Sequence, residues 1–261
     1  MTPAEIANKS CRASNFGALL FCCLLAAGCF GPGDDPVAGI YRVRHVIDGD
    51  TVVLEGGGKV RLIGINAPEL GHDGEADEPL ARLARTALRE LIGGKPVQLV
   101  DGAEAHDRHG RRLAHLESAD GVNVQQALLW QGLAAVVVFP PNLRNRERYL
   151  QVEIEARAAG RGIWDHPYFK PREIDALPGG ETGFRFVTGE VEKITKSRRY
   201  ITLWLSPHFA LLIGRGEWKA FWSGRPSQYA GQRVVARGWL FKVGAGRRMR
   251  IRHPDMLNVP Q

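Results

Sequence analysis

The residues best suited to chemistry lie in three short segments of the first half of the sequence: 48–51 (Asp-Gly-Asp-Thr), 61–69 (Arg-Leu-Ile-Gly-Ile-Asn-Ala-Pro-Glu) and 107–111 (Asp-Arg-His-Gly-Arg). Acidic residues beside a glycine can offer oxygens to a hard cation. A glutamate past a strand end can act as a general base, and two arginines can bind a phosphate. Together these residue types indicate phosphodiester hydrolysis. On type alone, a turn and a charged surface remain equally open.

Three strands must position the first two segments. The stretches 40–47 and 51–54 are rich in β-branched residues, and 59–65 alternates polar with apolar residues, so each is predicted to be a strand. The three glycines at 56–58 predict a hairpin turn between the second and third strands.

Helices and two further strands are predicted to complete this half. Apolar residues recur at helical spacing from Leu80 to Ile92, with Asp77 expected as the cap, Pro79 near the first turn and Gly93-Gly94 at the end. The remaining elements are predicted as strands 96–100 and 112–117 and helices 122–131 and 143–159. Five strands with helices predict an α+β fold, a small OB-type five-stranded barrel.

The order and spacing of these segments resemble the thermonuclease (staphylococcal-nuclease-like) family. The similarity runs from about Ile40 to Asp165 and includes 121–123, 131–134 and 162–164 (Gly-Val-Asn, Gln-Gly-Leu-Ala and Gly-Ile-Trp). The family cuts DNA and RNA by water attack, depends on calcium and leaves 3′-phosphate ends. The resemblance therefore implies a nuclease with a staphylococcal-nuclease-like barrel.

The resemblance also implies roles for individual residues. Asp50 matches a metal-ligand aspartate, Asn66 a second one, Ala67 the residue whose backbone carbonyl binds the metal, and Asp48 a nearby supporting acid. Arg61 and Arg111 match the arginines that hold the phosphate. Glu69 matches the glutamate proposed as the general base, or as the organiser of the attacking water.

Three departures from the family pattern affect these roles. Asn66 stands where aspartate is expected, so one negative charge is lost and calcium should bind more weakly. His109 stands where the family often has a base-stacking tyrosine, although an imidazole can also stack. A further aromatic contact is expected to be replaced near Val138 and Phe139.

A zinc site built from His72, His106 and His115 is disfavoured, since only His106 and His109 have metal-like spacing.

The N-terminal residues predict export. Lys9 and Arg12 precede a short apolar run, 16–27, which is too short to span a bilayer comfortably, and small residues follow it. The sequence 24–29, Leu-Leu-Ala-Ala-Gly-Cys, resembles a bacterial lipoprotein signal that would leave Cys29 lipidated, except that alanine replaces the usual leucine at position 26. An ordinary cleaved signal peptide is the alternative. All four cysteines lie within the first 29 residues, so the rest of the chain forms no disulfide.

Charge separates the two halves of the chain. The whole sequence carries a formal net charge of +7 and 44% hydrophobic residues, the composition of a soluble globular protein with a plausible polyanionic partner. Residues 29–180 contain 18 Lys and Arg against 22 Asp and Glu, a net charge of −4, whereas residues 181–261 contain 15 against 5, a net charge of +10. The two segments are therefore predicted to do different jobs.

The basic segment is predicted to be a second small β-rich domain, OB-like by pattern alone because no internal sequence repeat is evident. Its predicted strands are 186–194, 200–205, 209–213, 233–241 and 248–252. Arginines alternate with apolar residues along 248–252, which predicts one basic face. We expect Trp204, Trp239 and Phe241 to pack in the core, and the excess of arginines, Arg237 among them, to tether nucleic acid. A basic solvated surface is the alternative.

The predicted organisation is a signal peptide at 1–28, a flexible tether at 29–38, the nuclease domain at 39–169, a linker at 170–183 and the basic domain at 184–261. The leading hypothesis is an exported, calcium-dependent nuclease of low sequence specificity, held at the bacterial cell envelope by a lipid anchor on Cys29 or else secreted. The alternative is a catalytically weakened, envelope-anchored nucleic-acid-binding protein. A purely structural lipoprotein explains neither the arginines nor the motif.

Overall fold

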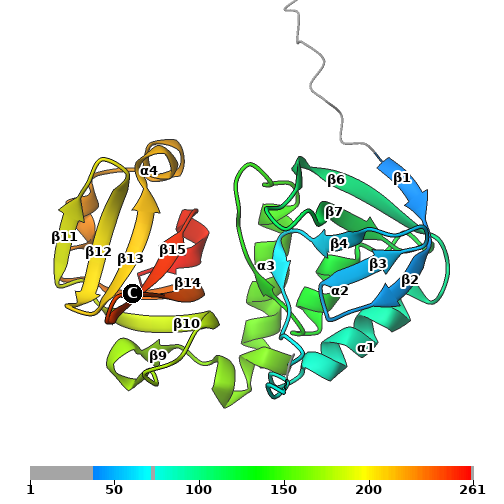
Figure 1. The fold of residues 1–261 in the computed structure, drawn as a ribbon, viewed down its shortest axis with the longest axis horizontal. Coiled ribbons are helices and arrows are strands. Elements are labelled where there is room, and N and C mark those ends of the chain that lie inside the picture. Colours follow the sequence, from blue (N-terminus) through cyan, green and yellow to red (C-terminus); the bar gives the residue numbers. More distant parts are fainter. Residues whose placement is uncertain (1–37, 72–73, 260–261) are drawn as a thin grey trace, which may run out of the picture. The chain divides into compact units, whose positions relative to one another are not determined.

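Two β-barrels, one after the other along the chain, make up the computed structural model (Figure 1). It describes residues 38–71 and 74–259. The predicted signal peptide, Cys29 and nearly all of the predicted tether lie outside them. No helix among the described residues is long and apolar enough to cross a membrane.

The first barrel is a six-stranded sheet in the order β1-β6-β7-β4-β3-β2. Because a single residue separates β1 from β2, the two act as one bent strand, and the sheet closes on itself. The strands are β1 (Ala38–Tyr41), β2 (Val43–Val46), β3 (Thr51–Leu54), β4 (Lys59–Leu62), β6 (Val97–His106) and β7 (Arg112–Glu117). Counted as five strands, the order is 1-2-3-5-4-1 with the third and fifth parallel, which confirms the predicted OB-type barrel.

The hairpin between β3 and β4 forms as predicted. The glycines at 56–58 have φ angles of 84°, 97° and 92°, a region that residues with a side chain rarely adopt. The turn therefore needs glycine, and it sets the register that pairs Thr51 with Arg61.

Three helices pack against the first barrel: α1 (Ala81–Ile92), α2 (Val124–Trp130) and α3 (Arg146–Ala158). Most of the predicted apolar stripe of α1 is buried or partly buried, although Leu83 is 52% exposed, and Gly93 ends the helix with a φ of 59°. The predicted cap is wrong: Leu80 occupies the N-cap position, and Asp77 instead accepts hydrogen bonds from the Gly71 amide and the Arg82 side chain. Asp77 thus fixes the loop before the helix, not the helix end.

A short two-stranded ladder joins the rim of the barrel to the segment before α3. Its strands are β5 (Ile65–Asn66) and β8 (Ala135–Val136). This pairing was not predicted, because neither strand is long enough to show a pattern in sequence.

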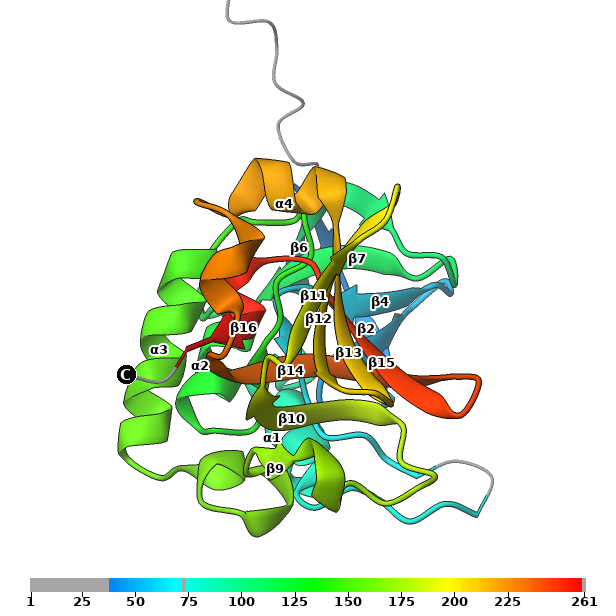
Figure 2. The same ribbon diagram turned by 90° about the vertical axis from the view of Figure 1, so that its left-hand side faces the viewer.

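The second barrel repeats the strand order of the first. The sheet runs β11-β12-β13-β15-β14-β10, with β9 added beside β10. Figure 2 shows the second barrel facing the viewer, with its strands forming a curved sheet. The strands are β10 (Gly183–Glu190), β11 (Lys193–Lys196), β12 (Tyr200–Ser206), β13 (Phe209–Gly214), β14 (Arg233–Val243) and β15 (Gly246–Ile251).

The repeat extends beyond strand order. Strands β10 and β11 follow each other closely and close the barrel, as β1 and β2 do, and β13 pairs parallel to β15, as β4 does to β7. A helix, α4 (Arg215–Phe221), lies between the third and fourth strands, where the first barrel has α1. The predicted OB-like second domain therefore matches the observed topology, although no sequence repeat revealed it.

The segment 170–183, predicted as a linker, is packed against the second barrel. It contains β9 (Arg172–Glu173), which pairs parallel to β10, and it buries Ile174 and Leu177. The proline and glycine content that suggested a linker belongs to turns. The described residues all belong to one compact unit, and the predicted domain boundaries stay predictions.

The core predictions for three aromatic residues had mixed outcomes. Trp239 packs against Phe139 and Phe184, with ring centroids 5.5 and 5.0 Å away. Trp204 is only partly buried, and Phe241 is 40% exposed, so the core prediction is wrong for both. Both lie on outward-facing strand positions, alternating with buried leucines such as Leu203 and Leu240.

Candidate active site

The turn between β2 and β3 carries two buried acids. Asp48 accepts a hydrogen bond from the Asp50 amide at 2.9 Å, and Asp50 is only 1% exposed. Gly49 between them is required by close packing, since a Cβ there would lie 2.6 Å from the Cβ atoms of both Ala67 and Ala84. A side chain at position 49 would therefore push the acids away from α1 and from Ala67.

Arg61 on β4 holds two of the predicted metal ligands together. Its Nη1 lies 2.5 Å from Oδ2 of Asp50, and its Nη2 donates to Oδ1 of Asn66 at 3.0 Å. The guanidinium is 11% exposed, so these contacts form largely out of water. The side chain predicted to hold phosphate is thus part of the predicted metal cluster.

Asn66 and Ala67 complete this cluster at the end of β5. The Ala67 amide donates to Oδ2 of Asp50 at 2.7 Å, and the Asn66 side-chain amide donates to the Ala67 carbonyl at 3.2 Å. Ala67 is therefore hydrogen-bonded to both of the other residues predicted to bind the cation, Asp50 and Asn66.

Glu69 lies at the exposed rim beside this cluster. Partial withdrawal from water raises the pKa of its carboxyl, as does Asp48, while Arg61 and Arg111 lower it. Burial raises the pKa of Asp50 well above its usual value; Arg61 opposes this rise, and Asp48 and Glu69 add to it. The pKa values of Asp50 and Glu69 therefore both depend on Arg61 and on Asp48, and that of Glu69 also on Arg111.

Arg111 is positioned by the turn between β6 and β7. Asp107 accepts from the amides of His109 and Arg111 and also binds the Arg111 side chain, whose Nε lies 2.7 Å from Oδ2. His109 is exposed on this turn, and its Nε2 accepts from Nε of Arg108 at 3.0 Å. Asp107 thus holds both the backbone and the side chain of Arg111 in position, whereas His109 lies at the surface.

A glutamate that was not predicted to belong to the site supports the backbone at Glu69. Glu78 accepts from the Glu69 amide at 3.0 Å, and its other oxygen accepts from Tyr168 and Arg185, both at 2.9 Å. In sequence Glu78 belongs to an acidic run, and nothing distinguishes it from its neighbours.

Gln125 of α2 is a second unpredicted positioning residue. It is fully buried and bonds the backbone of Ile63, Ala114 and Leu116, which ties β7 to the segment that follows β4. A polar residue on an apolar helix face was the available signal.

Within the described part of the chain, no group of three or more His, Cys, Asp or Glu side chains is arranged to hold a metal ion. The cluster at Asp50 falls outside that description because two of its members, Asn66 and the Ala67 carbonyl, contribute neutral oxygens.

Comparison with known proteins agrees with this geometry. The family described as "Staphylococcal nuclease homologue" matches residues 59–166. The thermonuclease of Staphylococcus intermedius is 33% identical over 129 residues, which cover 48% of this chain and 76% of that protein. An uncharacterized endonuclease of Escherichia coli O157:H7 is 33% identical over 127 residues, covering 47% and 75%. Endonuclease YncB of Bacillus subtilis is 33% identical over 125 residues, covering 46% and 59%. The chain therefore belongs to the staphylococcal nuclease homologue family of nucleases.

Proposed function

We propose that this nuclease is exported, depends on calcium, and hydrolyses phosphodiester bonds in DNA or RNA with low sequence specificity, leaving 3′-phosphate ends. The observation that carries the proposal is the ion pair between Arg61 and the buried Asp50, together with Glu69, whose pKa both Arg61 and Arg111 lower. In the proposal this combination supplies a base and two phosphate-binding cations beside a buried carboxylate.

The residues fit a calcium ion by their donor chemistry. Asp50, Asn66 and the Ala67 carbonyl offer only oxygens, which calcium prefers, and Asp48 and Glu69 add negative charge nearby. Burial raises the pKa of Asp50 because the ionised carboxylate has lost the stabilisation that water provides. A cation bound beside it would restore that stabilisation. When bound, the ion would supply further stabilisation of negative charge on the phosphate.

The side chains of the site have separable roles in this proposal. Glu69 accepts a proton from the attacking water, and its raised pKa makes it a stronger base than an ordinary glutamate. The water oxygen forms a bond to phosphorus, the bond from phosphorus to the 5′ oxygen breaks, and the departing 5′ oxygen takes a proton from solvent to leave as a hydroxyl. Arg61 and Arg111 stabilise the charge that accumulates on the phosphate oxygens.

Asn66 favours the second candidate, a weakened enzyme that mainly binds nucleic acid. Its neutral amide oxygen already accepts from Arg61, so it offers calcium less attraction than a carboxylate would. The intact Arg61, Glu69 and Arg111 favour the enzyme.

Digestion of plasmid and single-stranded DNA with calcium or with chelator separates the two candidates. The proposal expects cleavage with calcium, none with chelator, and product ends that a polymerase extends only after phosphatase treatment. If the DNA stayed intact under all conditions, the weakened nucleic-acid-binding protein would be the remaining candidate. Extension without phosphatase would contradict 3′-phosphate products.

We also propose export with lipidation at Cys29, from the apolar run and the residues 24–29. Mass measurement of the mature protein, with and without globomycin, tests it. A mature chain that lacks Cys29, or carries it unmodified, would contradict the lipid anchor.

A further inference from the structure

The second barrel has an outward face that its strand register defines. Lys193 pairs with Trp204, Trp204 with Ala210, Ala210 with Arg248, and Arg248 with Phe241. These five residues form one row across β11, β12, β13, β15 and β14. Side chains directly opposite one another in a sheet share a face. The row therefore presents cation, aromatic, small residue, cation and aromatic, in that order.

Burial of the residues in between shows that the row points out of the barrel. Leu203 and Leu205 flank Trp204, and Leu211 and Met249 are the neighbours of Ala210 and Arg248; all four are at most 3% exposed. Successive strand residues point to opposite faces, so the row itself faces outward. Ala210, in the middle of the row, is itself fully buried, so the members that reach solvent are Lys193, Trp204, Arg248 and Phe241.

Two contacts, one within the row and one with a neighbouring residue of β11, hold the indole of Trp204 in place. The guanidinium of Arg248 lies 4.7 Å from the Trp204 ring centroid, and the indole Nε1 donates to Thr195 at 2.9 Å. Phe241 stays 40% exposed. An exposed ring beside a fixed indole and a guanidinium is an arrangement on which unpaired bases can stack.

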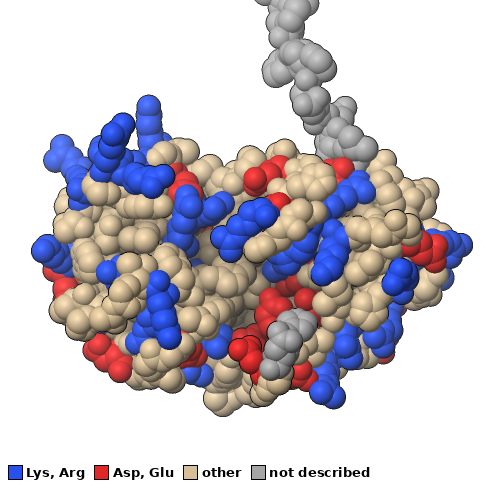
Figure 3. Space-filling view, viewed as in Figure 1, with Lys and Arg blue, Asp and Glu red and all other residues tan. Residues whose placement is uncertain are grey.

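Other exposed basic residues lie at the opposite end of β12 and β13 from the row, where Tyr200 pairs with Gly214. Lys196, Arg198 and Arg199 are exposed at the turn between β11 and β12, and Arg215 and Lys219 are exposed on α4. Figure 3 shows Lys and Arg side chains gathered over this part of the second barrel. In OB barrels the second and third strands, with the loop between the first and second, bind oligonucleotides. Here those elements are β12, β13 and the β11–β12 turn.

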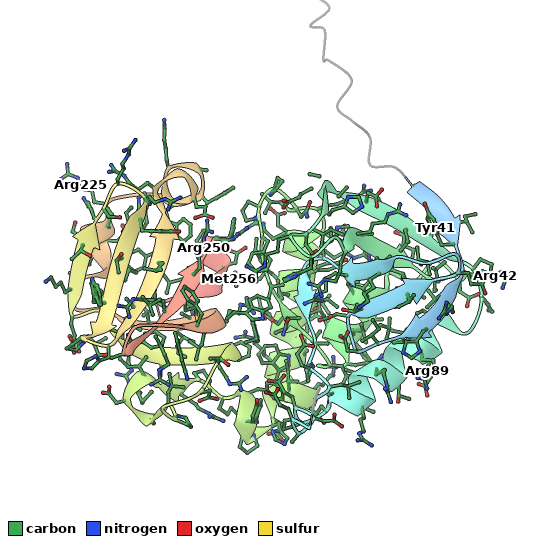
Figure 4. All side chains as sticks on the ribbon, in the orientation of Figure 1. Tyr41, Arg42, Arg89, Arg225, Arg250 and Met256 are labelled. Carbon is green, nitrogen blue, oxygen red and sulfur yellow. The ribbon has the colours of Figure 1, made fainter. Side chains whose placement is uncertain are left out.

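Several arginines predicted to bind nucleic acid are instead occupied within the fold. Arg237 is buried against Glu153, Arg247 donates to the carbonyls of Leu177 and Pro178, and Arg252 lies over the ring of Phe139. Arg250, seen on β15 in Figure 4, binds Glu217. Arg248 also makes internal hydrogen bonds, since its Nη1 donates to the carbonyls of His208 and Arg247, but it is the β15 arginine that pairs with the exposed Phe241.

We propose that the row of Lys193, Trp204, Arg248 and Phe241 binds single-stranded nucleic acid, separately from the active site. Bases stack on Phe241 and Trp204, and Arg248 and Lys193 bind backbone phosphates. Paired bases hide their faces, so the row distinguishes single strands from duplex. The inference rests on the proposed function only in that the bound strand would be substrate; the binding itself needs no cleavage.

Fluorescence anisotropy of the full chain in chelator, with a labelled oligothymidylate of about 20 nucleotides, tests the row. The variant Phe241→Ala/Arg248→Gln should raise Kd roughly tenfold or more, because base stacking on one aromatic residue is worth that much. The slope of log K against log salt should fall by about 0.7 for the lost phosphate contact. The matched control Leu83→Ala/Arg89→Gln removes an exposed apolar side chain and a charge from α1, and should change Kd less than about twofold.

Three results would overturn the proposal: no binding of the oligonucleotide by the unaltered chain, equal effects of the row variant and the control, or an equal loss of affinity for blunt duplex. Failure of calcium-dependent cleavage would refute the proposed function and leave these binding measurements unaffected.

Discussion

A buried ion pair between α3 and β14 gives the sharpest test of how the two barrels are held together. Nη1 of Arg237 lies 2.6 Å from Oε2 of Glu153, and both side chains are at most 8% exposed. Glu153 also accepts from the Val136 amide at 2.7 Å, and Arg237 donates to the Asp255 carbonyl at 3.0 Å.

Arg237→Met should lower the free energy of unfolding by about 3 kcal/mol. Removing one partner of a buried pair costs about 3–5 kcal/mol, because the remaining charge is left uncompensated. The lower end applies here because Arg157 lies 3.2 Å from the Glu153 carboxylate and partly replaces the lost charge. Glu153→Gln should cost a similar amount, since it leaves Arg237 buried without a counterion.

The double variant Glu153→Gln/Arg237→Met should cost only about 1 kcal/mol, because it removes both charges and keeps an acceptor for the Val136 amide. Urea unfolding of all four proteins, followed by two probes to check two-state behaviour, measures the cycle. Single variants that cost less than about 1 kcal/mol, or a double variant that costs the sum of the two, would refute this reasoning.

Three further changes have defined outcomes. Asn66→Asp should lower the calcium concentration for half-maximal cleavage about tenfold by adding a carboxylate; an unchanged calcium titration would place the ion elsewhere. Burial lowers the pKa of His115 from 6.5 to about 4, so stability should be complete above pH 6.5 and fall by about 3 kcal/mol as the pH drops to 4. His115→Phe should remove that dependence, and unfolding at pH 7 and pH 4.5 checks it. Gly132→Ala should cost more than about 2 kcal/mol, measured by urea unfolding, because φ is 67° and the new Cβ would meet the Arg161 carbonyl; a cost near zero would contradict the contact.

Local patterns predicted most of the first barrel. The apolar stripe of α1, the glycines at 56–58 and the alternation in β4 each determine their element within a few residues. Elements that exist through distant pairing were missed: β9 and β5 are two residues long and pair with strands that sequence periodicity does not connect to them. Asp77 was misassigned because its hydrogen bonds to Gly71 and Arg82 depend on loop geometry.

The same limit applies to the sites. Family resemblance assigned Asp50, Arg61, Glu69 and Arg111 to one site, in which the structure shows an ion pair between Arg61 and Asp50. It did not indicate that Arg61 bridges Asp50 and Asn66, because that contact depends on side-chain direction. Arg237 looked like one more surface arginine because its partner is 84 residues away.

The turnover of the Glu69 and Arg111 variants tests the central claim most directly. With calcium present, Glu69→Gln and Arg111→Ala should each lower kcat on single-stranded DNA by at least about 100-fold, as single acid–base or charge-stabilising groups do. The affinity of Glu69→Gln for the same strand in chelator should stay within about twofold of the unaltered protein. Full turnover by either variant would contradict the assignment of catalysis to this site.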